Sequence, residues 1–171
     1  PWAGADVVDV GCGDGFHLPV FAREAASVIG VEPHPPLVER ARRRGLTVLE
    51  GGAAALPLPP SSVDLLHART AYFFGAGCEP GLAEARRVLR PGGALAIVDL
   101  DATVAPYGDW MRADIPHYDP VAAERFFVRR GFSLRRVATR WAFPDRATLE
   151  AVLRIEFSRA TADRALAAVP G

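Results

Sequence analysis

A glycine-rich segment flanked by acidic side chains is the first candidate for chemistry in this sequence. Asp9 lies in an apolar run, and Gly11, Gly13 and Gly15 follow it at every second position. Glycine allows a backbone to turn tightly and to approach a ligand closely. Glu32 ends a second apolar run, where a carboxylate can accept hydrogen bonds from both hydroxyls of a ribose. Together these residues predict a site for an adenosine-containing ligand.

The spacing of the glycines separates two kinds of ligand. A dinucleotide-binding turn reads G-x-G-x-x-G, and its third glycine lets a helix N-terminus face a pyrophosphate. Counted from Gly11 or from Gly13, that third position is Phe16 or Leu18, so the pattern fails in both registers. An acid beside the turn suits a cationic ligand better than a pyrophosphate. A nicotinamide-dependent oxidoreductase is therefore the alternative, and competition with NAD would test it.

The elements that must position these residues alternate between strand and helix patterns. Five apolar runs predict strands: residues 7–10, 28–31, 46–49, 63–66 and 94–100. Helical patterns follow the glycine turn and recur at residues 37–44, 79–89, 121–130, 145–157 and 160–169. Apolar strands joined by helices predict a parallel sheet buried on both faces. We expect one doubly wound α/β domain over residues 1–171, with a sixth strand at 132–143.

Five segments carry a resemblance to a known family. They are residues 7–15 (VVDVGCGDG), 28–33 (VIGVEP), 51–57 (GGAAALP), 62–66 (SVDLL) and 87–98 (RVLRPGGALAIV). In this order they are similar to the motifs of class I S-adenosylmethionine-dependent methyltransferases of the small-molecule type, whose first motif reads like VLDLGCGTG. The resemblance implies a Rossmann-like fold, S-adenosyl-L-methionine as cofactor, and methylation of a small-molecule acceptor. Residues 1–100 would then be the cofactor-binding half and 101–171 the substrate-side and closing elements.

The resemblance also implies a role for each cofactor-site residue. The amino-acid part of the cofactor would be held by Asp9 and the turn of Gly11, Cys12, Gly13 and Gly15. Glu32, followed by Pro33, would bind the ribose hydroxyls, and Gly52-Ala53 would lie along the adenine edge. Ala68 and Arg69, after the fourth strand, would close over the methionine side.

Gly52 departs from the family pattern. The family usually has Asp at this position, where the carboxylate accepts a hydrogen bond from the adenine amino group. Gly52 cannot accept that bond, although the backbone N–H of Ala53 could still donate to the ring. A lost hydrogen bond to a charged group costs about 1.5–3 kcal/mol, so we expect reduced cofactor affinity. The departure favours one further alternative, a non-catalytic module that binds an adenosine ligand with the methyltransferase fold.

Candidate acceptor-side residues follow the fourth and fifth predicted strands. They are His67, Tyr72, Asp101, Trp110 and Tyr118. Methyl transfer from a sulfonium mainly requires alignment, which can be worth roughly 7–11 kcal/mol, and needs a base only when the acceptor must lose a proton. We prefer His117 as that base, because histidines titrate near the working pH and its loop is expected to overhang the site. The Asn/Asp-Pro-Pro-Tyr/Phe motif of amino-methylating DNA enzymes is absent, which leaves a small molecule as the default acceptor.

Composition and charge limit the remaining possibilities. All 20 basic residues are arginine, 20 acidic residues balance them, and the absence of lysine excludes a Schiff base and a GK[ST] phosphate loop. Zero net charge argues against a nucleic-acid partner, and no apolar run reaches the roughly 18 residues of a membrane span. Two cysteines give no disulfide framework and suit a cytoplasmic location. No metal site is predicted. With no seventh strand and no N-terminal helix visible, we expect weak cofactor binding or a homodimer formed across the exposed sheet edge.

Overall fold

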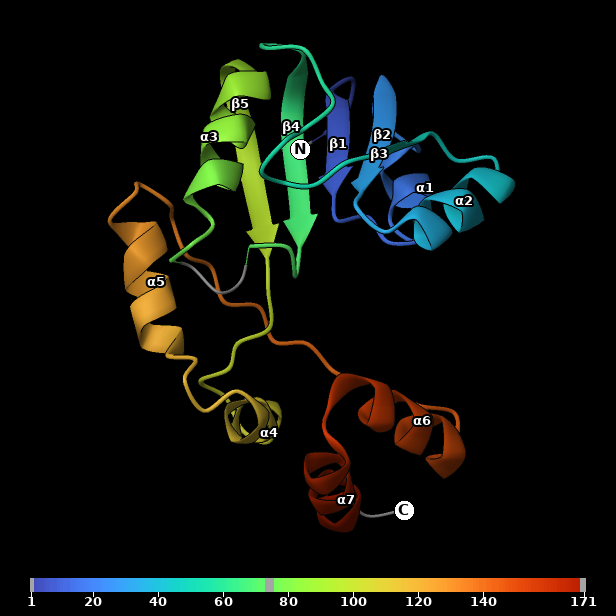
Figure 1. The fold of residues 1–171 in the computed structure, drawn as a ribbon, viewed down its shortest axis with the longest axis vertical. Coiled ribbons are helices and arrows are strands. Elements are labelled where there is room, and N and C mark those ends of the chain that lie inside the picture. The colour runs from blue at the N-terminus through green and yellow to red at the C-terminus, as the bar shows by residue number, and fades with distance from the viewer. Residues whose placement is uncertain (1, 73–75, 170–171) are drawn as a thin grey trace. The chain divides into compact units, whose positions relative to one another are not determined.

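A computed structural model describes residues 2–72 and 76–169 of the chain. The chain divides into two compact units, residues Pro1–Leu100 and Asp101–Gly171. Figure 1 shows the order of the elements, with the strands in the first unit and four helices in the second.

The first unit is built on a five-stranded parallel sheet with the order β3-β2-β1-β4-β5 (Figure 1). Its strands are β1 (Asp6–Val10), β2 (Ser27–Glu32), β3 (Val48–Glu50), β4 (Val63–Arg69) and β5 (Leu89–Val98). The five predicted strands and the α/β class with a parallel sheet are confirmed. The strand order reverses between β1 and β4, and open parallel sheets bind their ligands beyond the carboxyl ends of the strands at such a point.

The described residues of this unit form the helices α1 (Leu18–Phe21), α2 (Pro35–Arg43) and α3 (Glu79–Val88). α1 and α2 lie beside β2 and β3, and α3 lies beside β5 (Figure 1). Successive side chains of a strand point to opposite faces, and Val7, Val8 and Val10 of β1 are each only 1% exposed. Both faces of the central strand are therefore buried, which gives the strand ends a rigid support.

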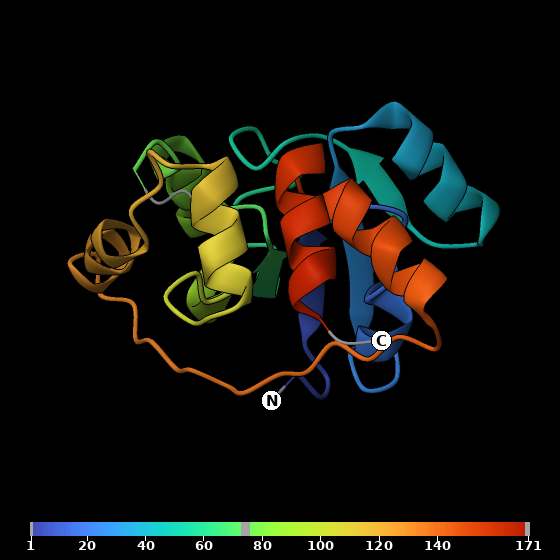
Figure 2. The ribbon, with the colours of Figure 1, turned by 90° about the horizontal axis from the view of Figure 1, so that it is seen from below.

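The second unit contains α4 (Tyr107–Asp114), α5 (Pro120–Val128), α6 (Arg146–Glu156) and α7 (Arg159–Ala168). The predicted helices at 121–130, 145–157 and 160–169 are confirmed, whereas α4 was not predicted. α6 and α7 lie side by side (Figures 1 and 2). Asp114 at the end of α4 accepts hydrogen bonds from the hydroxyls of Ser158 and Thr161, both at 2.6 Å, and so joins α4 to the start of α7.

The sixth strand predicted at 132–143 is wrong. This segment contains no strand, and no strand follows β5 anywhere in the described residues up to 169. Leu134 and Val137, two of the apolar residues behind the prediction, are 54% and 66% exposed. β-branched and aromatic residues favour a strand only when a neighbouring strand and a packed face are available, and the second unit offers neither. None of the described helices is long and apolar enough to cross a lipid bilayer.

Candidate functional site

The glycine turn follows β1 and is tied to the end of β2. The N–H groups of Gly11 and Cys12 donate to the Val31 carbonyl at 2.8 and 3.2 Å. Gly11, Gly13 and Gly15 have φ of +71°, +59° and +82°, a backbone region that strains other residues. A Cβ at Gly15 would collide with Leu46, whereas a Cβ at Gly13 would meet nothing within 4 Å. The backbone conformation of Gly15 thus favours glycine and Leu46 would have to shift for a larger residue, whereas Gly13 faces open space that a ligand could fill.

Glu32, the predicted ribose ligand, holds this turn in place. Its Oε2 accepts a hydrogen bond from Gly13 N at 2.9 Å, and its Oε1 accepts one from His34 N at 3.0 Å. Pro33 between them is exposed. A carboxylate has about four acceptor sites, so each oxygen keeps capacity for a second donor. The residue is 6% exposed, and the two N–H bonds compensate for its burial.

Asp9 and His67 form a buried pair on neighbouring strands. The β1–β4 register places them opposite each other, and Asp9 Oδ1 lies 2.7 Å from His67 Nδ1. Asp9 is 2% exposed, and in the described part of the chain its Oδ2 has no hydrogen-bond partner. Buried polar atoms normally have partners, so this oxygen indicates a donor supplied from outside the protein.

His17 was not singled out from the sequence, yet it belongs to this cluster. Its ring centroid lies 5.8 Å from that of His67, and its Nε2 lies 3.5 Å from the Arg69 guanidinium. Burial lowers the pKa of His17, and nearby Arg69 and His67 lower it further against the opposing effect of Asp9. Its position directly after the glycine turn was the available signal.

Cys12 is a packing residue within the turn. It is 7% exposed and contributes to a cluster with Leu18, Val38, Ala41 and Val48. Burial, with added repulsion from Asp9 and Glu32, raises the pKa of its thiol to about 12. A thiol that stays protonated at neutral pH is neither a nucleophile nor a redox centre.

The segment after β3 brings Gly52 and Ala53 next to the end of β2. Gly51 N donates to the Glu32 carbonyl at 3.1 Å, and Ala55 N donates to the Gly52 carbonyl at 3.0 Å. A Cβ at Gly52 would meet nothing within 4 Å. The residues predicted for ribose and adenine are therefore neighbours in the fold.

The predicted methionine-side residues end β4 and differ in exposure. Ala68 pairs with Val10 in the register and is fully buried. Arg69 follows it and is exposed. Because Ala68 points away from the face that holds Asp9 and His67, it can offer only its backbone at this edge.

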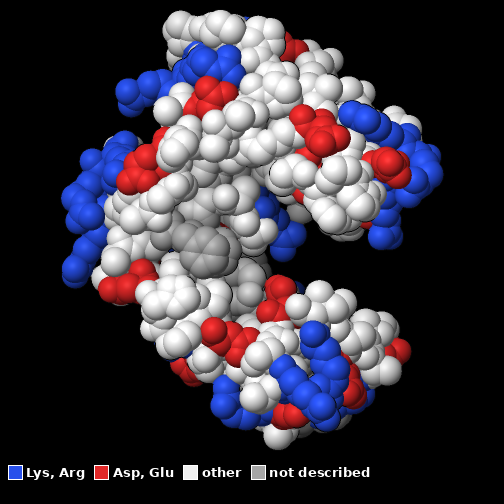
Figure 3. All heavy atoms as spheres, viewed as in Figure 1, with Lys and Arg blue, Asp and Glu red and all other residues white. Residues whose placement is uncertain are grey.

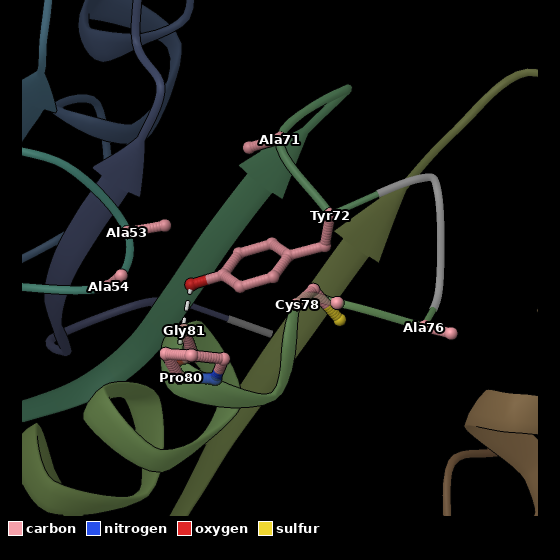
Figure 4. Close-up of a pocket in the computed structure, with 9 residues that line it drawn as sticks. Ala53, Ala54, Ala71, Tyr72, Ala76, Cys78, Pro80 and Gly81 are labelled. Atoms are coloured by element: carbon pink, nitrogen blue, oxygen red, sulfur yellow. Dashed lines mark hydrogen bonds between the residues drawn. The ribbon is translucent and has the colours of Figure 1, made fainter.

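A pocket of about 390 Å³ opens beside Ala53 in the same unit (Figure 4). It is lined by small residues and one aromatic ring: Ala53, Ala54, Ala71, Tyr72, Ala76, Gly77, Cys78, Pro80 and Gly81. The Tyr72 hydroxyl donates to the Gly81 carbonyl at 3.5 Å (Figure 4). Burial raises the pKa of Tyr72 to about 12, so this predicted substrate-side residue keeps its proton at neutral pH.

The remaining predicted acceptor-side residues lie in the second unit. His117 is exposed in the turn between α4 and α5. Asp101 accepts hydrogen bonds from Thr103 and from Arg136 Nε, the latter at 2.9 Å. The Trp110 ring packs at 6.0 Å from the Phe157 ring, and Tyr118 follows the end of α4 half-buried. The roles of these four residues in acceptor binding or catalysis stay predictions.

Charge around the glycine turn is mainly acidic. Asp14, which lies within the turn, forms ion pairs with Arg40 and Arg44, both at 3.3 Å. Two of the arginines in residues 40–44 therefore already have an acidic partner. On the face shown in Figure 3, arginine side chains on this helix lie beside acidic ones. No group of three or more His, Cys, Asp or Glu residues in the described ranges could hold a metal ion.

Comparison with known proteins identifies the family. A family model described as "Methyltransferase domain" matches residues 8–97, more than half of the chain. The chain belongs to this methyltransferase family. The resemblance to class I S-adenosylmethionine-dependent methyltransferases is confirmed, and S-adenosylmethionine is the cofactor of that family.

Individual relatives agree with this assignment. A Mycolicibacterium smegmatis protein described as "Probable S-adenosylmethionine-dependent methyltransferase" is 35% identical over 56% of this chain and 38% of its own length. A demethylmenaquinone methyltransferase from Corynebacterium kroppenstedtii is 26% identical over 90% of this chain and 68% of its own. The crystal structure of an S-adenosylmethionine-dependent methyltransferase from Mesorhizobium loti has a TM-score of 0.53 at 25% identity, covering 61% of this chain and 51% of that one. The chain spans about a third to a half of the first curated relatives that it matches.

Proposed function

We propose that the first unit binds S-adenosylmethionine at the carboxyl ends of β1, β2 and β4, and that the chain transfers its methyl group to a small-molecule acceptor. The observation that carries the proposal is the pair of buried carboxylates at the glycine turn. Glu32 holds Gly13 from one side, and Asp9 has an oxygen without a partner in the described residues.

The residues at the turn fit a cationic ligand. S-adenosylmethionine has an ammonium and a sulfonium group, and the buried acids Asp9 and Glu32 supply the opposite charge. We assign the partnerless Asp9 Oδ2 to the ammonium group, since a buried carboxylate oxygen needs a donor. Open space at Gly13 and Gly52 leaves room for the ligand backbone and base.

The other residues of the proposed site then have the following roles. When bound, S-adenosylmethionine supplies a methyl group that its own positive charge activates. Glu32 accepts hydrogen bonds from the ribose hydroxyls with the acceptor sites that Gly13 and His34 leave. Ala53 lies along the adenine edge, and Arg69 closes over the methionine side. The protein contributes mainly alignment of the methyl group and the acceptor.

The nicotinamide alternative has less support. A pyrophosphate is usually bound at the N-terminus of a helix that follows the glycine turn, where N–H groups and the helix dipole attract negative charge. Here α1 has only four residues, Leu18–Phe21, and the buried carboxylates of Asp9 and Glu32 adjoin the turn. These features disfavour a doubly charged pyrophosphate.

A small-molecule acceptor is proposed because motifs for nucleic-acid and protein acceptors are absent from the sequence. Arg40 and Arg44, which could contribute to a basic patch, pair with Asp14. We keep His117 as the proposed base for an acceptor that must lose a proton.

Calorimetric titration with S-adenosylmethionine and S-adenosylhomocysteine tests the proposal. We expect micromolar binding that Glu32→Ala weakens at least tenfold, or about 1.4 kcal/mol. Glu39→Ala is the matched control, because this glutamate is exposed on α2 and pairs only with Arg43 in the described residues, so its loss should not change the affinity. Binding of NAD in preference to both ligands would favour the oxidoreductase. Binding of S-adenosylmethionine without turnover on any pool of small molecules would favour the non-catalytic module.

A further inference from the structure

An ion pair on α3 holds the backbone of the segment that carries Gly52 and Ala53. The Arg87 guanidinium donates two hydrogen bonds of 2.7 Å to the Glu84 carboxylate, from Nε to Oε1 and from NH2 to Oε2. The pair also reaches the segment itself. Glu84 Oε2 accepts from Leu56 N at 2.9 Å, and Arg87 donates to the carbonyls of Leu58 at 2.8 Å and Leu56 at 3.0 Å.

Three backbone polar groups of an irregular segment are thus satisfied by two side chains. Residues 51–58 contain no helix or regular strand, so their N–H and C=O groups depend on such partners. The Leu56 side chain is 4% exposed and is buried beside this anchor. Arg87 and the Leu56 N–H together lower the pKa of Glu84 to about 2, so the pair stays charged at any pH near neutral.

The second anchor of the segment is Glu32. Gly51 N donates to the Glu32 carbonyl, while the Glu32 carboxylate holds Gly13. Between the two anchors lie only residues 52–55, closed by the bond from Ala55 N to the Gly52 carbonyl. Fixing both ends of so short a turn fixes Gly52 and Ala53 with it.

We propose that Glu84 and Arg87 are positioning residues that set cofactor affinity by holding residues 52–55 against the adenine. The inference rests on the proposed cofactor site. Both residues act through the Leu56 and Leu58 backbone, because every bond that joins the pair to the segment is made there. Losing Glu84 removes the bond to Leu56 N, and losing Arg87 removes the bonds to the two carbonyls. Either loss weakens the anchor at this end of the turn, so the ligand must order the turn further on binding.

The test uses the full chain and three variants, Glu84→Gln, Arg87→Met and the double variant. Arg86→Met is the matched control, because Arg86 is the exposed neighbour on the same helix. Affinity is measured for S-adenosylhomocysteine and for 5′-methylthioadenosine, which has the adenosine half but no amino-acid part. Hydrogen exchange of the amides of residues 53–56 and 58 is recorded without ligand.

We expect each single variant to weaken both ligands by the same factor, roughly 2- to 30-fold. The double variant should lose less affinity than the product of the two single factors, because both residues act through one segment. Faster exchange should be confined to the amides of residues 53–56 and 58. By contrast, Asp9→Asn should weaken S-adenosylhomocysteine much more than 5′-methylthioadenosine, because Asp9 is assigned to the amino-acid part.

Two outcomes separate the inference from the proposed function. If the unaltered chain binds neither ligand, the proposed cofactor site is wrong. If the unaltered chain binds and folded Glu84→Gln and Arg87→Met bind equally well, the inference is overturned while the site stands. Should either variant fail to fold, Arg87→Lys decides, because lysine keeps the charge but cannot make the forked contact. Unchanged affinity and exchange in Arg87→Lys would also overturn the inference.

Discussion

Replacing Gly52 with aspartate is expected to increase cofactor affinity. The methyltransferase family usually has an aspartate here that accepts a hydrogen bond from the adenine amino group. The structure accommodates that side chain, since an added Cβ meets nothing within 4 Å and Gly52 is not among the residues with positive φ. The neighbouring Gly51 differs, because a Cβ there would lie 2.8 Å from Pro57 Cδ.

The size of the gain follows from two opposing contributions. A hydrogen bond to a charged acceptor contributes about 1.5–3 kcal/mol. Ordering the new side chain costs about 1 kcal/mol. No cost for strain or collision is added, because the site at Gly52 is open. The net gain is about 0.5–2 kcal/mol, or roughly 2- to 30-fold in the dissociation constant.

The assay compares two ligands of equal charge. S-adenosylhomocysteine has the amino group, whereas S-inosylhomocysteine has a carbonyl oxygen in its place and offers the carboxylate nothing at that position. Gly52→Asp should therefore bind the first ligand more tightly and the second no better than the unaltered chain. Gly52→Asn is a control that has nearly the size of aspartate without its charge. Gly52→Ala is a control for folding stability, which should rise by about 0.4–1 kcal/mol because the unfolded chain becomes less flexible.

Equal gains for both ligands would refute the reasoning, because they would come from charge at a distance. No gain for S-adenosylhomocysteine in a folded Gly52→Asp chain, while the unaltered chain binds it, would place adenine away from Gly52. Gly51→Asp is the steric control, and we expect it to lose stability.

Two further predictions concern the cysteines and the sheet edge. In the folded chain at pH 8, Cys12 should resist alkylation by iodoacetamide, whereas the half-buried Cys78 should react. A pKa of about 12 leaves roughly one Cys12 thiol in ten thousand ionised at this pH. Labelling of Cys12 at the rate of Cys78 would contradict the burial of Cys12. β5 pairs only with β4 among the described strands, so its other edge is open and we propose a homodimer across that edge. Sedimentation equilibrium should give twice the chain mass at micromolar concentration. A monomer at every concentration would exclude the homodimer.

The first unit could be predicted from sequence because its central strand, β1, is buried on both faces. Val7, Val8 and Val10 form an apolar run that only Asp9 interrupts, which is typical of a buried parallel strand. The segment at 132–143 also contains β-branched and aromatic residues, but it pairs with no strand of the described residues, and residue type alone cannot show that. Helix α4 was not predicted because it contains Gly108, and glycine disfavours a helix. A Cβ there would collide with the Ala102 backbone, so this glycine allows close packing and does not end the helix.

The candidate site shows a similar division between local and long-range information. Glu32 and the glycine turn could be placed because strand ends and glycine spacing are local features. The Asp9–His67 bond could not, since it depends on the register between strands whose paired residues are 58 positions apart. The acceptor-side role of His67 stays a prediction, and the structure adds its bond to Asp9, the carboxylate that we assign to the cofactor. The anchors at Glu84 and Arg87 had a visible signal in their i,i+3 spacing, but nothing local indicated that they would reach Leu56.

The Asp9 carboxylate also connects ligand binding to stability. One of its oxygens has a histidine donor, and the other is buried without a partner in the described residues. Leaving a buried acceptor unsatisfied costs about 1–3 kcal/mol, and more for a charged group. A ligand ammonium group would remove the cost by donating to Oδ2, whereas a ligand without one would leave it in place. The amino-acid part of the cofactor should thus contribute more to binding than its contact area suggests, because it satisfies an atom that folding has already taken out of water.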